Sequence, residues 1–164
     1  MTFSSIGNKK LDDFVNNSLI EWKIVEQRPG ATAILEGTLE GKIIQITNYT
    51  TKGLSKSQIR AQRHKLVDDW LENIASSILK NRRNHGRCVE PVNISEWLFK
   101  AEKALGIQKN SMKIEQARAL FSDVISKAKR IHNSTESQLA HGLNKSACDS
   151  CNPLLEYFNI KEIF

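Results

Sequence analysis

The sequence has no long apolar run and contains few cysteines, prolines and aromatic residues. Its 164 residues include three cysteines, three prolines and 7% aromatic residues. No stretch approaches the roughly 20 apolar residues that span a bilayer. Residues Met1 to Lys10 also lack the apolar core of a secretory signal. We therefore expect a soluble chain without a membrane partner, which forms a single domain over residues 1–164.

The cysteine pattern argues against a disulfide framework, because the number of cysteines is odd and no export signal precedes them. Two of the cysteines, Cys148 and Cys151, have Cys-x-x-Cys spacing. In a reducing compartment this spacing indicates either a metal clip or a redox pair. A thioredoxin-like redox pair is expected after an early strand, whereas this pair lies close to the end of the sequence.

The composition is that of a globular domain with a basic surface. Hydrophobic residues make up 40% of the chain and charged residues 26%, which is enough for one real core. The formal net charge is +6 and the sequence pI is about 9.3. A basic domain attracts polyanions such as nucleic acid, although many other soluble proteins carry a similar charge.

The first half of the sequence predicts a helix, a hairpin and a second helix. Apolar residues at helical spacing predict a helix over residues 9–20. Residues 31–36 and 42–47 predict two β-strands around a glycine-containing connection. A long amphipathic helix is expected over residues 57–80. Its basic residues, with one that precedes it, extend a possible basic surface: Lys56, Arg60, Arg63 and Lys65.

The second half predicts a helix over residues 88–105 that Gly106 ends and whose first turn contains Pro91. Residues 117–126 fit a buried strand, and periodicity equally allows a helix from Ile114; we take the strand. The remaining expected elements are a polar loop over residues 133–147, a short helix over residues 148–158 with Pro153 near its start, and a closing strand over residues 160–164.

Two motifs carry candidate chemistry, and each opens a predicted helix. The first is Cys88-Val89-Glu90-Pro91 and the second is Cys148-Asp149-Ser150-Cys151. Backbone N–H groups and the helix dipole stabilise thiolates at such positions. Three thiolates leave one position of a tetrahedral zinc ion open for water, as in catalytic zinc sites. Zinc lowers the pKa of that water towards ~7. We therefore predict Zn²⁺ as cofactor, held by Cys88, Cys148 and Cys151.

Glu90 lies two residues after the first predicted ligand, so it need not bind the metal. From there it can reach the water and a ring nitrogen of a bound base. In nucleobase deaminases, a glutamate so placed shuttles protons. Their signature is His-x-Glu followed by Pro-Cys-x-x-Cys, with three cysteines allowed. This chain has Cys-x-Glu and Ala-Cys-x-x-Cys.

The segment from His85 to Pro91 resembles the first motif of the YwqJ-type bacterial toxin deaminases, within the cytidine deaminase-like superfamily. The segment from Ala147 to Phe158 resembles their second motif. The resemblance extends to Ala117-Arg118-Ala119 and to His141-Gly142, and it covers roughly the C-terminal half. Ala147 departs from the family, which usually has proline there, and this bears on the shape of the loop rather than on the ligands.

The resemblance implies a cytidine deaminase-like three-layer α/β fold, with a central mixed sheet and helices on both faces. It also implies an interbacterial toxin domain that damages nucleic acid or nucleotides of a competitor. Such a domain is a secreted effector that acts in the target-cell cytoplasm and travels with a cognate immunity protein.

We expect zinc-dependent hydrolytic deamination, with cytosine as the favoured base, in single-stranded nucleic acid or a nucleotide. Glu90 is the predicted catalytic acid and base. The predicted substrate-binding residues are Asn48, His85 and Arg87. Asn48 ends the second predicted strand, where this fold often places a ribose-contacting asparagine. His85 and Arg87 belong to a basic run next to the metal motif, which suits phosphate.

Three other interpretations remain open at this point. His85 or His141 could complete a closed structural Cys₃His zinc site. The chain could also be a non-catalytic basic nucleic-acid-binding domain with a structural zinc site. A nuclease toxin that uses the histidines is a third class, but no histidine pair has a recognisable catalytic spacing.

Overall fold

A computed structural model describes residues 5–21, 31–50, 54–74, 88–131, 144–145 and 151–163. Within these ranges, helix α1 spans Ser5–Glu21 and strands β1 and β2 span Ala31–Leu39 and Lys42–Tyr49. The strands pair antiparallel around the turn Glu40-Gly41, and both turn residues have positive φ angles of 51° and 78°. Positive φ at both central residues is the requirement of a type I′ turn. The predicted helix and hairpin are confirmed, with longer strands and a shorter connection than expected.

The hairpin forms one side of a mixed sheet whose described strands run in the order β2-β1-β3-β4. Strand β3 (Ile125–Arg130) pairs antiparallel with β1 and with β4 (Asn144–Lys145). Strand β5 (Lys161–Glu162) pairs parallel with the start of β3. The predicted closing strand is therefore present as β5. Strand β4 lies inside the segment expected to be a polar loop, so that expectation is wrong for residues 144–145.

The prediction of one long helix over residues 57–80 is wrong, because the helix is interrupted at Arg63 and His64. Helix α2 spans Lys56–Gln62 and α3 spans Lys65–Asp69, and a short π-helix, η2, follows at Trp70–Ile74. Both residues of the break are extended, with ψ angles of 146° and 145°. The His64 ring begins α3, since its Nδ1 accepts the Leu66 N–H at 3.1 Å. Residues 75–80 lie outside the described residues.

The predicted strand over residues 117–126 is also largely wrong. Helix α5 spans Ile114–Leu120, and only Ile125 and Ser126 of the predicted strand belong to β3. The Gln116 side chain accepts the Lys113 N–H at 3.1 Å and so caps the helix start. Ala117 and Phe121 are both buried and lie one helical turn apart, which is the spacing of a helix. The first part of the apolar run therefore belongs to a helix, and only its last two residues belong to a strand.

The two helices that open with the candidate motifs form as predicted. Helix α4 spans Val89–Leu105, and Gly106 ends it in the left-handed conformation with φ 69°. Helix α6 spans Cys151–Tyr157 and contains Pro153 near its start. The expected beginning of that helix, residues 148–150, lies outside the described residues.

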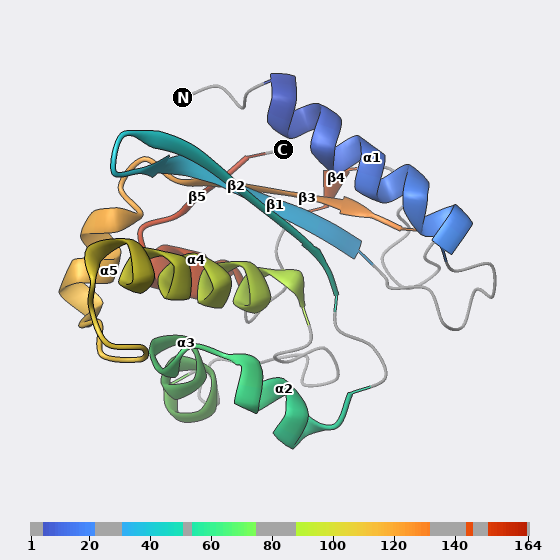
Figure 1. The fold of residues 1–164 in the computed structure, drawn as a ribbon. Coiled ribbons are helices and arrows are strands. Elements are labelled where there is room, and N and C mark those ends of the chain that lie inside the picture. Colours follow the sequence, from blue (N-terminus) through green and yellow to red (C-terminus); the bar gives the residue numbers. More distant parts are fainter. Residues whose placement is uncertain are drawn as a thin grey trace.

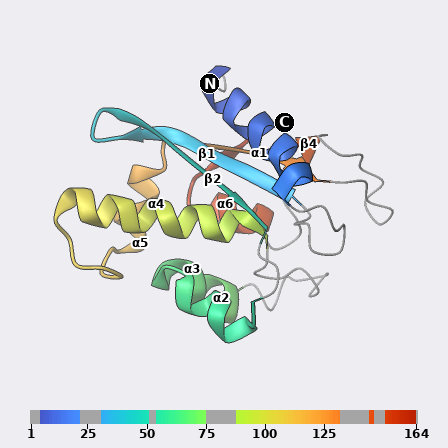
Figure 2. The same ribbon diagram turned by 45° about the vertical axis from the view of Figure 1, so that its right-hand side comes forward.

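The helices cover both faces of the sheet, as Figure 1 and the turned view of Figure 2 show. Helix α1 lies on one face, whereas α4 and α6 lie on the other and contact each other. Helices α2 and α3 lie on the same side of the sheet as α4, and α3 contacts α4 (Figure 1). The predicted three-layer α/β fold with a mixed central sheet is therefore confirmed.

The main core lies between the sheet and the α4 side. Its largest fully buried side chains include Leu35, Leu71, Trp97, Leu98, Phe121 and Phe158. Trp70 of η2 packs against Tyr157 of α6, with 6.1 Å between the ring centroids and a tilt of 37°, and this contact joins η2 to the helix of the second motif. No helix among the described residues is long and apolar enough to cross a membrane.

Candidate active site

The first motif forms the start of α4. Cys88 is the N-cap residue, with φ −67° and ψ 162°, and only 8% of its surface is exposed. Its thiol makes no capping hydrogen bond to the helix. Glu90 lies in the first turn and is 3% exposed. The positive end of the helix dipole lies at this helix start, and Pro91 costs little there because it has no N–H that needs a partner.

Small side chains on the sheet allow this helix start to lie close to the strands. Val89 packs on Ala33 of β1 and Ala128 of β3, which are direct cross-strand partners. On the far side of Ala128, the register continues to Lys145 of β4. One transverse row of the sheet thus connects the residue after Cys88 with the strand that precedes Cys148 in the sequence.

The second motif is described only in part. Cys151 is the first residue of α6, and this helix contacts α4. Cys148 and the side chain of Cys151 lie outside what the structure describes, as do the predicted substrate residues His85 and Arg87 and also His141. Among the described residues, no group of three His, Cys, Asp or Glu side chains is placed to hold a metal ion. Two contacting helices that each begin at a cysteine nevertheless fit a thiolate-bound zinc ion.

Asn48 lies in β2 opposite Ala33, and it is half-buried. Its amide Nδ2 donates to Oδ1 of Asn93 at 2.9 Å. Asn93 is fully buried on α4, three residues after Glu90, and its own Nδ2 donates to the Ala33 carbonyl at 3.0 Å. The structure therefore links Asn48 to a residue of α4 that lies about one helical turn after Glu90. Asn93 was not among the residues predicted from the sequence, although a polar residue on the apolar face of a predicted helix is a usable signal.

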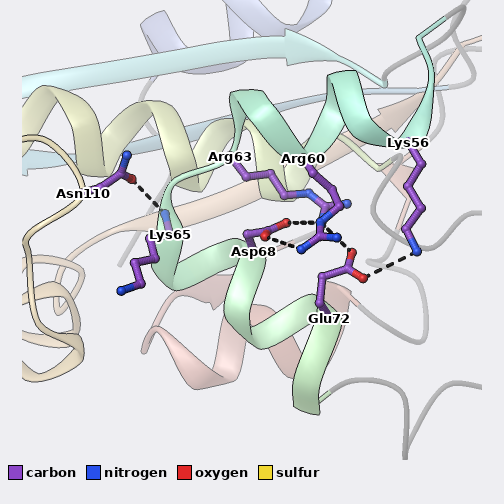
Figure 3. A network of polar contacts seen from close by, with 7 residues as sticks. All are labelled: Lys56, Arg60, Arg63, Lys65, Asp68, Glu72 and Asn110. Atoms are coloured by element: carbon purple, nitrogen blue, oxygen red, sulfur yellow. Dashed lines mark hydrogen bonds and ion pairs between the residues drawn. The ribbon is translucent and has the colours of Figure 1, made fainter.

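The basic residues expected along α2 are largely engaged by carboxylates (Figure 3). Asp68 binds Arg60 at 3.0 Å and Arg63 at 2.9 Å. Glu72 binds Arg63 at 3.1 Å and Lys56 at 3.5 Å. Burial raises the pKa of Asp68, but hydrogen bonds from Arg60 and Arg63 outweigh burial and hold that pKa below its usual value. The positive charges of Lys56, Arg60 and Arg63 are therefore largely compensated by these two carboxylates.

Glu72 responds in the same way as Asp68. Burial raises its pKa, but the Arg63 hydrogen bond and the charges of Lys56, Arg60 and Arg63 lower it further than burial raises it. Lys65 contributes through its backbone, whose N–H donates to Oδ1 of Asn110 at 2.9 Å (Figure 3). The ion pairs thus join α2 to α3 and η2, and the Asn110 hydrogen bond joins the start of α3 to the loop after α4.

A second buried acid, Glu102, lies near the other end of α4. His64 approaches it at 2.9 Å from Nε2 to Oε2, and the N–H groups of Asn110, Ser111 and Met112 donate to it at 3.0 Å each. Because Nδ1 of His64 accepts from Leu66, its ring proton lies on Nε2 and points to Glu102. Burial raises the pKa of Glu102, but these hydrogen bonds hold it below its usual value.

A mixed sheet between helices, with Cys-x-Glu opening a buried helix and a second cysteine opening its neighbour, is the arrangement of a deaminase-type enzyme. The model of the YwqJ-like deaminase family matches residues 15–160, so the chain belongs to that family. The resemblance stated from the motifs is confirmed, and it extends well beyond the C-terminal half. No curated protein and no solved structure matches the chain.

Proposed function

We propose that the protein hydrolyses the exocyclic amine of a nucleobase, with cytosine as the favoured base, at a zinc site formed by Cys88, Cys148 and Cys151. The observation that carries this proposal is the burial of Glu90 in the first turn of α4, two residues after Cys88. A carboxylate at that place is shielded from bulk solvent and lies beside a predicted metal ligand. Zinc, when bound, supplies Lewis-acid activation of water near neutral pH.

Glu90 then serves as the proton carrier. It accepts a proton from the attacking water, delivers it to the ring nitrogen of the base, and assists departure of the amine as ammonia. The balance is one water consumed and one ammonia released for each amine converted to a carbonyl, and Glu90 returns to its starting protonation state. Burial suits this role because a carboxylate in a dry site exchanges protons with the substrate rather than with solvent.

Three residues are proposed to hold the substrate around that centre. Asn48 of β2 hydrogen-bonds to Asn93, which lies about one turn after Glu90 on α4, and Asn48 is proposed to contact the sugar. His85 and Arg87, which precede Cys88 in a basic run, are proposed to attract phosphate. The net charge of +6 supports a polyanionic or nucleotide substrate, single-stranded where it is a polymer.

The biological role we propose is that of an interbacterial toxin domain. The support is the membership in the YwqJ-like deaminase family together with the toxin motifs that the chain resembles. In this role the domain is a secreted effector that acts in the target-cell cytoplasm, and its producer makes a cognate immunity protein that binds it.

The test compares two conservative substitutions on α4. Glu90→Gln is expected to lower ammonia release by about a thousandfold because the proton carrier is lost, while zinc content and thermal stability stay the same. The matched control is Glu96→Gln, which removes an exposed carboxylate of the same helix and is expected to leave turnover unchanged. Full activity of Glu90→Gln would contradict the proposal.

A further inference from the structure

The buried amide of Asn93 links α4 directly to both strands of the hairpin. It donates to the main chain of β1 and accepts from a side chain of β2. The β2 partner, Asn48, is itself held in place, because its backbone carbonyl accepts the Thr32 hydroxyl at 2.8 Å. A rigid strand and a rigid helix therefore fix the positions of both amide groups.

The hydrogen bonds also fix which way each amide faces. The Ala33 carbonyl can only accept, so Asn93 must present its NH₂ group to it. The Oδ1 atom of Asn93 then faces Asn48, and Asn48 must answer with its own NH₂ group. The opposite orientation of either amide would place two acceptors against each other. The Ala33 carbonyl thus sets the donor-to-acceptor direction of both hydrogen bonds in this series.

This direction determines what Asn48 offers to a ligand. With its NH₂ group turned to Asn93, the carbonyl oxygen lies on the other side of the same planar amide. Part of Asn48 is exposed, so that oxygen can accept a hydrogen bond from a bound molecule. A phosphate oxygen has no proton to donate to it, whereas a hydroxyl group does.

We propose that Asn93 is a positioning residue that locks the Asn48 amide so that its carbonyl oxygen accepts from a sugar hydroxyl of the substrate. The inference rests on the proposed function, in which Glu90 faces the base, and Asn48 contacts Asn93 about one turn after Glu90 on α4. The group attached to the base, its sugar, then lies next to Asn48. The substrate class follows: ribonucleosides, ribonucleotides or RNA, rather than the interior of a DNA strand, which has no sugar hydroxyl.

Binding tests this inference without turnover. The probes are cytidine and adenosine, each beside its 2′,3′-dideoxy analogue, titrated calorimetrically into zinc-loaded Glu90→Gln protein. We expect one hydroxyl-bearing nucleoside to bind about fivefold tighter than its analogue, the value of one hydrogen bond. In the same background, Asn93→Leu, which keeps the buried volume, removes this preference, and so does Asn48→Ala.

The double variant separates positioning from mere structural support. If Asn93 acts through Asn48, Asn48→Ala with Asn93→Leu loses no more affinity than Asn48→Ala alone. Glu96→Gln on the exposed face of the same helix keeps the full preference. Additive losses, a preference that survives Asn93→Leu, or the absence of any hydroxyl preference would overturn the inference. A hydroxyl preference in a protein that releases no ammonia with Glu90 intact would overturn the deaminase proposal and leave the Asn93 inference standing.

Discussion

Helix α4 carries two buried glutamates, and the comparison between them separates a structural carboxylate from a candidate catalytic one. Glu102 is 1% exposed and Glu90 is 3% exposed, so burial alone does not distinguish them. Glu102 accepts from one ring N–H and three backbone N–H groups, which occupy it fully and lower its pKa. Glu90 instead lies in the first turn, beside Cys88 and the positive end of the helix.

The surroundings of the two acids differ in the same sense. Around Glu102, the hydrogen bonds join α3, α4 and the loop before α5, near the end of α4 that is opposite Cys88. Towards the start of α4, the sheet offers small residues and the neutral amide of Asn48, and the helix offers the neutral amide of Asn93. One end of the helix is thus built to hold a loop, and the other end is suited to hold a ligand.

The largest effects are expected from matched substitutions of Glu90 and Glu102. Glu90→Gln is expected to remove about a thousandfold of turnover with little change in unfolding temperature. Glu102→Gln is expected to keep turnover but to lower the free energy of unfolding by about 2 kcal/mol, because an amide cannot accept from all four donors. Ammonia release and thermal unfolding, measured on the same samples, check both halves. Equal loss of activity in the two variants would erase the distinction.

The role of the Glu90 end of α4 as a metal site is tested by substitution of Cys88. Cys88→Ser is expected to lower bound zinc from about one equivalent to a small fraction, since the thiolate is a predicted ligand. A chelator should lower the unfolding temperature of the wild-type protein and have little effect on this variant, because only the bound state is stabilised by zinc. Metal analysis by mass spectrometry and thermal unfolding measure the two effects. Full zinc content in Cys88→Ser would contradict the ligand assignment.

Acid should act through Glu102. Its folded-state pKa is lowered from an ordinary value of 4.5, so its carboxylate stabilises the fold above that pH. This contribution is lost as the pH falls through the lower folded-state pKa. Chemical unfolding between about pH 6 and pH 3 is therefore expected to show a steeper loss of stability in the wild-type protein than in Glu102→Gln. Parallel curves would show that Glu102 is not a source of the acid sensitivity.

The smallest expected effect concerns the ion-pair cluster of α2. Asp68→Asn should lower the free energy of unfolding by about 1 kcal/mol, because Arg63, which is only 5% exposed, loses one of its two carboxylates. Asp13→Asn breaks an exposed pair with Lys9 on α1 and should change stability by less than about 0.5 kcal/mol. Urea unfolding at low and high salt compares the two. A larger effect at Asp13 would contradict this ranking.

Much of the fold follows from local sequence, and the errors have specific non-local causes. The turn glycine Gly41, the helix terminator Gly106 and Pro91 in a first turn each indicated an element end that the structure confirms. The break at His64 did not follow from periodicity, because its ring caps α3 and binds Glu102, which is 38 positions later in the chain. Hydrophobic periodicity depends only on residues that are close in the sequence, so it cannot predict the contact between His64 and Glu102.

The candidate site shows the same limit. The two cysteine motifs and Glu90 were identified from spacing, and the structure places Cys88 and Cys151 at the starts of two contacting helices. Asn93 was missed, because its role depends on the register that sets Ala33 opposite Asn48. Only the paired strands show that a buried amide on α4 has an acceptor on one side and a donor on the other.

The central claim is that this member of the YwqJ-like deaminase family converts a nucleobase amine to a carbonyl with the help of Glu90. The most direct measurement is mass spectrometry of the bases, with ammonia quantified in parallel, after zinc-loaded protein acts on single-stranded RNA, single-stranded DNA and free nucleotides. We predict uracil formed from cytosine, one ammonia for each, and about a thousandfold less conversion by Glu90→Gln. Unchanged bases in every substrate, with zinc bound to the protein, would contradict it.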